Sequence, residues 1–263
     1  MKTSILWLVT LLALTSCKRF MFHPREVRPS QTALNSRNVE KISMMPAKSS
    51  FKFILIGDTQ RFYDELDAFV THVNALENIS FVLLNGDLVD FGLNNEYNWI
   101  AGQLKKLNIP YVAAMGNHDM LGNGRKIFHE MFGPENFSFS YSNNKFICLN
   151  TNSRETGFDG KIPDTSWLRK ELSDGNGNIN MFILSHVPPF NADFDKALEP
   201  AFTKLLASHP KVRISLHGHE HKFSIQQPYA DSVTYLVAAA GNQRTYALVE
   251  VVGEQFSITE RHY

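Results

Sequence analysis

The chain has 263 residues, of which 43% are hydrophobic and 20% charged, and this length and composition predict one large globular domain rather than two. The formal net charge is zero, but residues 18–50 carry a net charge of +5 and residues 51–263 a net charge of −6. An acidic domain without clusters of basic residues argues against duplex nucleic acid as a ligand, because phosphate contacts dominate that affinity.

Residues 1–17 have the features of an export signal. Lys2 precedes the apolar run Ile5–Leu14, which is too short to span a bilayer because a spanning helix needs about 20 residues. The run ends in Leu14-Thr15-Ser16-Cys17, which resembles the lipobox of bacterial lipoproteins. That resemblance implies a membrane anchor through lipidated Cys17, in the bacterial cell envelope outside the cytoplasm, either periplasmic or at the cell surface. An ordinary signal peptide with an incidental cysteine is the alternative.

Residues 18–50 predict a flexible basic tether, because they mix Arg, Ser, Asn and Pro with few aromatic residues and no sustained apolar period. Basic residues beside a lipid anchor would favour anionic headgroups. The other cysteine, Cys148, lies in an apolar run and is predicted to be a small core residue. The domain is therefore expected to be stabilised by its core, without a disulfide.

From residue 51 the chain alternates between short apolar runs and amphipathic segments. The runs 51–56, 81–84 and 111–115 predict buried strands, and the segments 63–77 and 96–107 predict helices. A glycine and polar residues follow each strand. This alternation predicts a mostly parallel sheet whose right-handed crossovers bring the strand ends to one edge, and ligands bind at that edge in open α/β sheets.

The second half of the chain has a less regular pattern. The elements predicted there are a short helix at 125–132, a hairpin of strands 137–141 and 145–149 turning at Asn143-Asn144, a polar loop at 150–163, a helix at 166–172 capped by Asp164 or Thr165, a strand at 180–184, a helix at 200–208 and a strand at 212–216. Three or four strands follow, near 223–226, 234–239, 246–252 and 256–259, and we expect them to form a second sheet packed on the first.

Five predicted strand ends carry the side chains that bind divalent metals in proteins. A single Gly-Asp turn or a histidine beside a proline has an ordinary structural explanation, but recurrence at five strand ends favours a common site. The residues are Asp58 and Gln60, Asp87 and Asp90, Asn117 and His118, His186, and His219 and His221.

The motifs Gly86-Asp87-x-x-Asp90, Gly116-Asn117-His118-Asp119, a lone His186 after a strand, and Gly218-His219-x-His221 resemble the signature of the calcineurin-like metallophosphoesterases. They occur in the family's order between about Phe51 and Val251, and Ser166-Trp167-Leu168 resembles the family's Trp-Leu helix. The resemblance implies an α/β fold for residues 51–263, a four-layer α/β/β/α sandwich of two mixed sheets flanked by helices. It also implies hydrolysis of phosphate mono- or diesters at a dinuclear metal centre.

The resemblance further implies a role for each site residue. One metal would be held by Asp58, Gln60 and His221, the other by Asn117, His186 and His219, with Asp87 bridging them. The two divalent ions, Mn, Fe, Zn or Ni, would share a hydroxide that attacks phosphorus in line. His118 would aid the leaving group, Asp90 would orient its ring as a carboxylate partner, and Asp119 would shape the turn.

Two positions depart from the family pattern. Gln60 stands where most of the family has His, so that this ligand is an amide oxygen or is absent, which would favour manganese or iron over zinc. Phe91 stands where the protein serine/threonine phosphatases of this superfamily carry Arg, which argues against a protein substrate. We expect an open cleft for a phosphorylated small molecule or lipid.

The remaining histidines are assigned no catalytic role. His217 is expected to pack or to meet solvent, with a place behind the metal ligands as the alternative, and His23, His72, His129, His209 and His262 are expected to be uninvolved. The cationic candidates for additional phosphate contacts are Arg154, Lys161, Lys196 and Arg244. Two alternatives from other classes stay open. One is a non-catalytic surface lipoprotein that binds phosphate or metal, favoured only by Gln60, and the other is a protein for metal storage or delivery.

Overall fold

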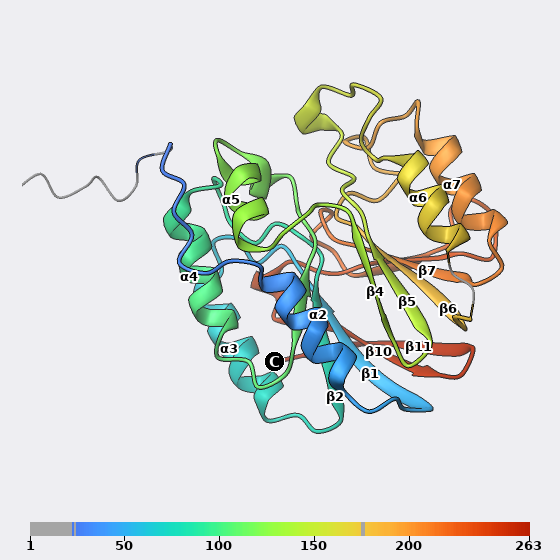
Figure 1. Ribbon diagram of the computed structural model, residues 1–263, viewed down its shortest axis with the longest axis horizontal. Helices are drawn as coiled ribbons and strands as arrows, with labels where there is room; N and C mark the ends of the chain where they lie inside the picture. Colours follow the sequence, from blue (N-terminus) through green and yellow to red (C-terminus); the bar gives the residue numbers. More distant parts are fainter. Residues whose placement is uncertain (1–22, 24, 175–176) are drawn as a thin grey trace, which may run out of the picture.

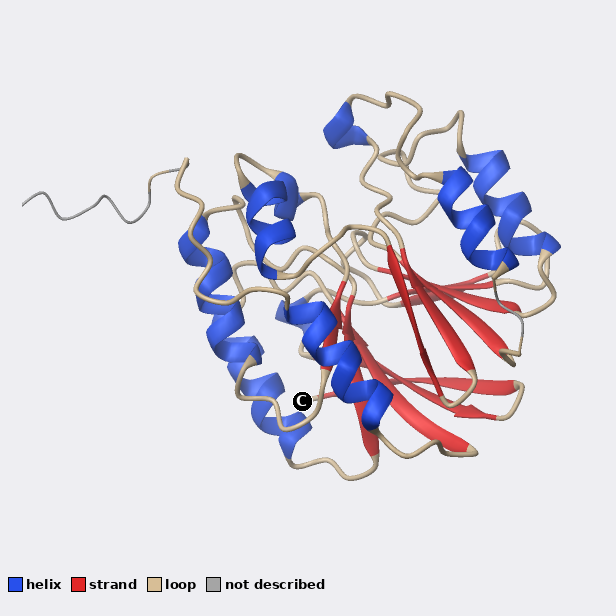
Figure 2. Ribbon diagram, viewed as in Figure 1, coloured by secondary structure: helices blue, strands red, loops and turns tan. Residues whose placement is uncertain are grey.

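The computed structural model describes residue 23, residues 25–174 and residues 177–263. Two mixed β-sheets lie face to face, and helices cover their outer faces (Figures 1 and 2). The predicted α/β/β/α sandwich is therefore confirmed. The expected signal segment, residues 1–17, lies outside the described residues.

The first sheet has the strand order β11-β10-β1-β2-β3, in which β1, β2 and β3 are parallel and β10 and β11 are antiparallel to their neighbours. Its strands are β1 (Ser50–Ile56), β2 (Ile79–Leu84), β3 (Tyr111–Ala113), β10 (Thr245–Val252) and β11 (Gln255–His262).

The second sheet has the order β4-β5-β6-β7-β9-β8, with β5, β6, β7 and β9 parallel and the two edge strands antiparallel. Its strands are β4 (Phe137–Tyr141), β5 (Asn144–Cys148), β6 (Asn180–Leu184), β7 (Val212–His217), β8 (Ser224–Gln226) and β9 (Thr234–Val237).

The helices are α2 (Leu34–Met44), α3 (Tyr63–Asn74), α4 (Asn94–Leu104), α5 (Gly124–Met131), α6 (Thr165–Ser173) and α7 (Glu199–Ser208), and short 3-10 turns η1 (His118–Met120), η2 (Arg154–Thr156) and η3 (Gly241–Gln243) interrupt the loops. The predicted cap of α6 is Asp164, whose carboxylate accepts the Trp167 N–H at 2.9 Å. In the part of the chain that the structure describes, none of the helices is long and apolar enough to cross a bilayer.

Three layers of apolar side chains hold the sandwich together. Alternate residues of β1 point to opposite faces, as the period of two in a strand requires. Ile54 and Ile56 pack against α3 and α4, while Phe53 and Leu55 pack between the sheets. A third cluster lies between the second sheet and the helices α6 and α7. Cys148 is a buried free thiol between the sheets, as predicted.

The expected division of strands between the sheets was wrong for the last two. β10 and β11 return to the first sheet, where β10 pairs antiparallel with β1 through Phe51 and Val251. The physical reason is that one edge of β1, on the side away from β2, is free. The backbone N–H and C=O groups of β1 on that edge need partners. Only β8 and β9 belong to the second sheet.

The expected flexible tether at 18–50 also differs from the structure, because α2 forms within it. The helix lies across the edge of the sandwich and contacts β3 of one sheet and β4 of the other (Figure 1). Leu34 and Ile42, both buried, join the core clusters. Residues eight apart lie on the same face of a helix, so the sequence does carry an apolar stripe here, although it is short.

Asparagine side chains explain why α2 stays at this edge. β3 is the outermost strand of its sheet, and its free edge leaves backbone groups unpaired. Asn35 supplies both partners that Ala113 lacks: its Nδ2 donates to the Ala113 carbonyl and its Oδ1 accepts the Ala113 N–H, each at 2.9 Å. The helix therefore completes the sheet with side chains instead of a further strand.

Candidate metal centre

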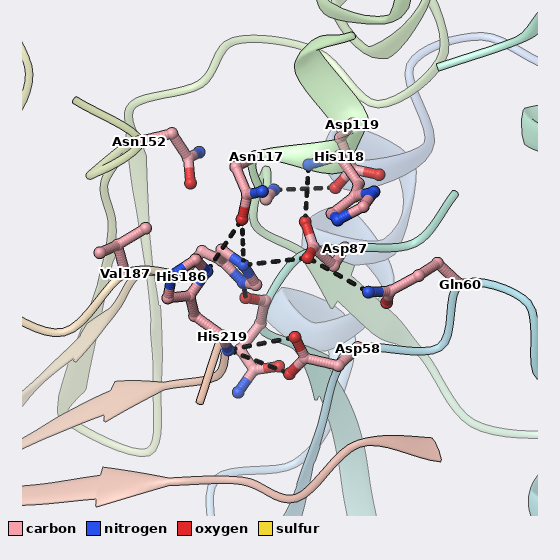
Figure 3. A network of polar contacts seen from close by, with 12 residues as sticks. Asp58, Gln60, Asp87, Asn117, His118, Asp119, Asn152, His186, Val187 and His219 are labelled. Carbon is pink, nitrogen blue, oxygen red and sulfur yellow. Dashed lines mark hydrogen bonds and ion pairs between the residues drawn. The ribbon is translucent and has the colours of Figure 1, made fainter. Parts of the chain in front are cut away.

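The site lies where the carboxyl ends of five strands from the two sheets meet (Figure 3). β1, β2 and β3 deliver Asp58, Asp87 and Asn117, and β6 and β7 of the other sheet deliver His186 and His219. The structure thus brings together, from segments far apart in the sequence, the strand ends that the sequence singled out.

Two glycines allow these strand ends to approach one another. Gly86 has a positive φ of 100°, and a Cβ atom at this position would lie 2.8 Å from the His186 ring. A Cβ atom on Gly116 would lie 2.0 Å from the Asp87 backbone nitrogen. Any larger residue at either position would push the neighbouring strand end away from the site.

Asp87 lies at the centre of the site and is almost completely buried. Its carboxylate accepts the His118 backbone N–H at 2.9 Å and the Gln60 Nε2–H at 3.3 Å, and it lies 3.3 Å from His186 Nε2. Burial alone raises the pKa of Asp87, but the charge and hydrogen bond of His186 and the neighbouring His118 outweigh burial, so that the net pKa is lowered. Asp87 is therefore an anion that faces several elements at once.

A first group of acceptor atoms converges beside Asp87. Asn117 Oδ1 lies 3.0 Å from His186 Nε2 and 2.9 Å from His219 Nδ1. His186 Nδ1 faces the Asn85 carbonyl oxygen at 2.8 Å, and a carbonyl accepts only, so Nδ1 carries the proton and Nε2 offers a lone pair to the site. Lone pairs that face one another at these distances require a proton or a cation between them. Burial lowers the pKa of His186, but the Asp87 charge outweighs burial and raises the pKa to about 10, so Nε2 holds a proton until a cation takes its place.

A second group lies on the other side of Asp87. Asp58 is fully buried, and both of its oxygens accept the His219 backbone N–H at 3.1 Å. His221 Nε2 lies 3.3 Å from Asp58 Oδ1, and this hydrogen bond raises the pKa of His221. Gln60 Oε1 is buried and has no hydrogen-bond partner among the described residues. Because a buried acceptor without a partner costs free energy, this oxygen is suited to a cation.

The chemistry of these donors fits two divalent ions. Carboxylate and amide oxygens with imidazole nitrogens are the ligand set of zinc, manganese and iron sites. The ligand atoms of Asp87, His186 and His219 lie within 4.8 Å of one another, and so do those of Asp58, Asp87 and His221. Asp87 belongs to both groups, as its expected bridging position requires.

Several site residues have a strained backbone. Asp58, Asp87, His219 and His221 have φ between 50° and 71°, a left-handed conformation that costs a non-glycine residue about 1–2 kcal/mol. Strain of this kind persists where surrounding contacts fix it, and it is common at functional sites. Here it turns the side chains into the site directly after the strands.

His118 lies beside the metal groups, but its contact with Asp90 differs from the expectation. Nδ1 of the ring lies 2.8 Å from the Asp90 backbone carbonyl and 3.8 Å from its carboxylate. That carboxylate instead accepts the Arg61 Nε–H at 2.7 Å. The ring is therefore oriented by the main chain of Asp90, because Arg61, which follows Gln60 directly, occupies the carboxylate.

Asp119 shapes the turn, as predicted. Its carboxylate accepts the backbone N–H groups of Leu88 and Val89 from the β2 loop and of Gly116 from its own loop, at 2.8–3.1 Å. Asp119 thereby joins the two loops that carry Asp87 and His118.

The sequence did not indicate two charged residues at the rim, Arg61 and Asp193. Asp193 Oδ2 lies 3.2 Å from His219 Nε2 and accepts a hydrogen bond from Arg154 at 3.0 Å. Neither residue belongs to a motif, and the nearest signal is the position of Asp193 within a polar loop. Lys161 and Lys196, two of the other cationic candidates, pair with Asp159 and Glu199.

The remaining histidines lie outside the ligand groups. His217 is buried, contacts Ser185 Oγ at 3.1 Å and stacks on Tyr235, and burial together with His186 lowers its pKa to about 3. It therefore packs as a neutral core residue. His72 contacts the Tyr246 hydroxyl and His129 contacts Glu135, both away from the site.

Comparison with known proteins supports the same family. The sequence profile of the calcineurin-like phosphoesterases matches residues 51–223. A probable cyclic nucleotide phosphodiesterase of Fibrobacter succinogenes is 27% identical over 143 residues, which are 51% of this chain and 54% of that protein, so the match spans about half of that relative. A 3′,5′-cyclic-nucleotide phosphodiesterase of Nostoc sp. is 26% identical over 197 residues, which cover 70% of this chain and 73% of that protein. A dimetal phosphatase from Danio rerio has the same fold, with a TM-score of 0.66 at 15% identity over 81% of this chain and 96% of that one.

Proposed function

The chain belongs to the calcineurin-like phosphoesterase family, whose members are metal-dependent phosphoester hydrolases, and on this premise we propose that it hydrolyses a small-molecule phosphodiester. The observation that carries the proposal is the position of Asp87. Its carboxylate faces both groups of candidate ligands and also fixes the loop of His118. An anion shared by two cation sites beside an imidazole suits phosphoryl transfer, in which charge develops on several oxygens at once.

The two bound ions would polarise the phosphoryl oxygens and lower the pKa of water. The chain's own residues would do the rest. Asp58, Gln60 and His221 would hold one ion and Asn117, His186 and His219 the other, with Asp87 between them.

His118 would donate a proton to the leaving oxygen. Its Nδ1 faces the Asp90 carbonyl, which only accepts, so Nδ1 carries a proton and Nε2 is the nitrogen that exchanges a proton with the substrate. The ring is partly exposed, which gives a substrate access to Nε2. General acid catalysis of this kind contributes about 10²–10⁴-fold to a rate.

Two observations support a diester over a monoester and over a phosphoprotein. The similar proteins from Fibrobacter succinogenes and Nostoc are named as cyclic nucleotide phosphodiesterases. Phe91, which follows Asp90, is exposed. It is uncharged, whereas the protein serine/threonine phosphatases of this superfamily carry an arginine at this position.

The test compares bis(4-nitrophenyl) phosphate, 3′,5′-cyclic AMP and 4-nitrophenyl phosphate as substrates of the protein, stripped of metal and reloaded with manganese, iron, zinc or nickel. We expect metal-dependent turnover that favours the diesters. His118→Ala should lower kcat by about 10²–10⁴-fold and leave two ions bound per chain. His129→Ala, which removes a histidine away from the site, is the matched control.

The outcomes separate the alternatives. Two bound ions without turnover of any ester would favour a protein that binds phosphate or stores metal. A preference for the monoester would support a phosphoester hydrolase but reject the proposed diester substrate. Turnover that survives in His118→Ala would reject the role of that residue.

We also propose that the protein is held at a membrane outside the cytoplasm through a lipid on Cys17. The support is the sequence Leu14-Thr15-Ser16-Cys17 after an apolar run. Membrane fractionation of cells that express the full chain tests this proposal: the wild type should sediment with membranes and incorporate labelled palmitate, and Cys17→Ala should do neither. Labelling that is equal in the two proteins would reject the anchor.

A further inference from the structure

Arg61 is held beside His118 by a contact that the expected chemistry does not require. Its Nε donates to Asp90 Oδ1 at 2.7 Å, and the same carboxylate oxygen lies 3.8 Å from His118 Nδ1. The guanidinium and the imidazole therefore share one oxygen as a neighbour. The Asp90 side chain is only 13% exposed, so its position is well fixed.

The backbone also helps to place Arg61. Gln60, the preceding residue, donates its N–H to the Asp87 carbonyl at 3.1 Å, which ties the β1 loop to the β2 loop. Arg61 itself has a φ of 67°. An arginine gains nothing from this left-handed conformation, which costs about 1–2 kcal/mol in an L-residue. The strain turns this side chain towards Asp90 at the rim of the site.

The outer end of Arg61 is open. Its side chain is 61% exposed. In residues 25–174 and 177–263, the terminal nitrogens Nη1 and Nη2 form no hydrogen bond with the protein, and Nε alone binds Asp90. A guanidinium held by Nε presents the two terminal N–H groups as a fork, which matches the geometry of phosphate oxygens.

Carboxylates otherwise dominate this side of the site, with Asp58, Asp87 and Asp90 close together. A substrate phosphate approaching His118 would meet their negative charge as well as the charge of the metals. Arg61 brings a permanent positive charge to this side. Its partner Asp90 binds Nε, so the terminal N–H groups stay open to a second anion.

We propose that Arg61 binds a non-bridging phosphoryl oxygen of the substrate, and of the phosphate product, through its terminal N–H groups on the His118 side of the metal centre. This inference rests on the proposed function. It adds a substrate-binding residue that no motif of the sequence contains. A role limited to holding Asp90 would use Nε alone and would leave phosphate affinity unchanged.

The test measures phosphate binding separately from turnover. Isothermal titration of the metal-loaded protein with inorganic phosphate gives Kd, and kinetics with bis(4-nitrophenyl) phosphate give kcat and KM. We expect Arg61→Ala to raise both Kd and KM by roughly 10–100-fold, the effect of losing a charged hydrogen bond, with a much smaller change in kcat. Arg61→Lys keeps the charge without the fork and should give an intermediate Kd.

Arg169→Ala is the control, because Arg169 is an exposed arginine of α6 away from the site. Metal content and Tm are measured for each variant, so that a loss of structure is recognised. An unchanged Kd for phosphate in Arg61→Ala with both metals bound overturns the inference, and so does a wild-type protein that binds metal but no phosphate. Phosphate binding that depends on Arg61 in a protein without turnover would support the inference while rejecting the proposed enzyme.

Discussion

The carboxylate of Asp193 lies 3.2 Å from Nε2 of His219. The other ring nitrogen, Nδ1, faces Asn117 Oδ1 within the candidate metal groups. A carboxylate at Nε2 holds a proton there, which leaves the Nδ1 lone pair free for a cation and fixes the orientation of the ring. Asp193 is thus a positioning residue for a candidate ligand.

Replacing this carboxylate should weaken metal binding. We expect Asp193→Asn to lower the affinity for one of the two ions by about 10–100-fold, the usual cost of losing a partner behind a metal ligand. Titration of the metal-free protein with zinc or manganese measures it. Arg154→Ala removes the other partner of Asp193 but keeps the carboxylate, so its effect should be much smaller. Equal losses in the two variants would contradict a direct action through His219.

Because Gln60 Oε1 is a buried amide oxygen without a partner among the described residues, we expect Gln60 to be a weak metal ligand. A stronger ligand at this position should raise the metal affinity. Gln60→His replaces the amide by an imidazole, which binds zinc more strongly. We expect the weaker of the two zinc affinities to rise at least about tenfold, which is about 1.4 kcal/mol. Gln255→His adds a histidine at an exposed position of β11 and should change neither affinity. An unchanged affinity in Gln60→His would mean that Gln60 does not face the ion.

The contact of α2 with β3 predicts that the segment before residue 50 contributes to stability. Asn35→Ala removes both partners of the Ala113 backbone groups. Unpaired buried polar groups cost about 1–3 kcal/mol each, so the free energy of unfolding should fall by about 2–6 kcal/mol in urea titrations. Glu40→Ala, at an exposed position of the same helix, is the control. Equal stability of the two variants would restore the interpretation of this segment as a tether.

Glu135 predicts a pH dependence of stability. Burial raises the pKa of this carboxyl, but hydrogen bonds from Arg125, His129 and Asn150 outweigh burial and lower the net pKa below its ordinary value of 4.5. A carboxyl whose pKa is lower in the folded chain stabilises the fold above its unfolded pKa, and this stabilisation is lost as the pH falls through the folded pKa.

The test replaces this carboxylate by an amide. Glu135→Gln should lower the free energy of unfolding at pH 7 by about 1–3 kcal/mol, and the difference from the wild type should shrink as the pH falls below 4.5. Urea unfolding at several pH values measures both quantities. The exposed Glu254→Gln should show no such difference at any pH. A difference for Glu135→Gln that is constant with pH would exclude the charge as its cause.

Much of the fold and most of the site followed from local patterns. The predicted strand at 180–184 coincides with β6, and the predicted helix at 63–77 contains α3, because apolar periodicity reflects which face of an element is buried. When a glycine and a metal-binding residue directly follow a strand, the side chain of that residue lies at the carboxyl edge of the sheet, irrespective of the contacts made elsewhere in the chain. For this reason Asp58, Asp87 and Asn117 could be assigned to one site.

Other features depended on contacts between distant parts of the chain. The apolar alternation of β10 suits either sheet, and only the free edge of β1 decided where it pairs. Likewise, Arg61 occupies the Asp90 carboxylate and Asp193 lies behind His219 because loops that are separate in the sequence meet at the rim. The elements that form, and the strand ends that carry metal-binding side chains, could be predicted because both depend on residues that are neighbours along the chain. The free edge and the charged partner that each element meets could not, because those contacts are set by proximity in the folded chain.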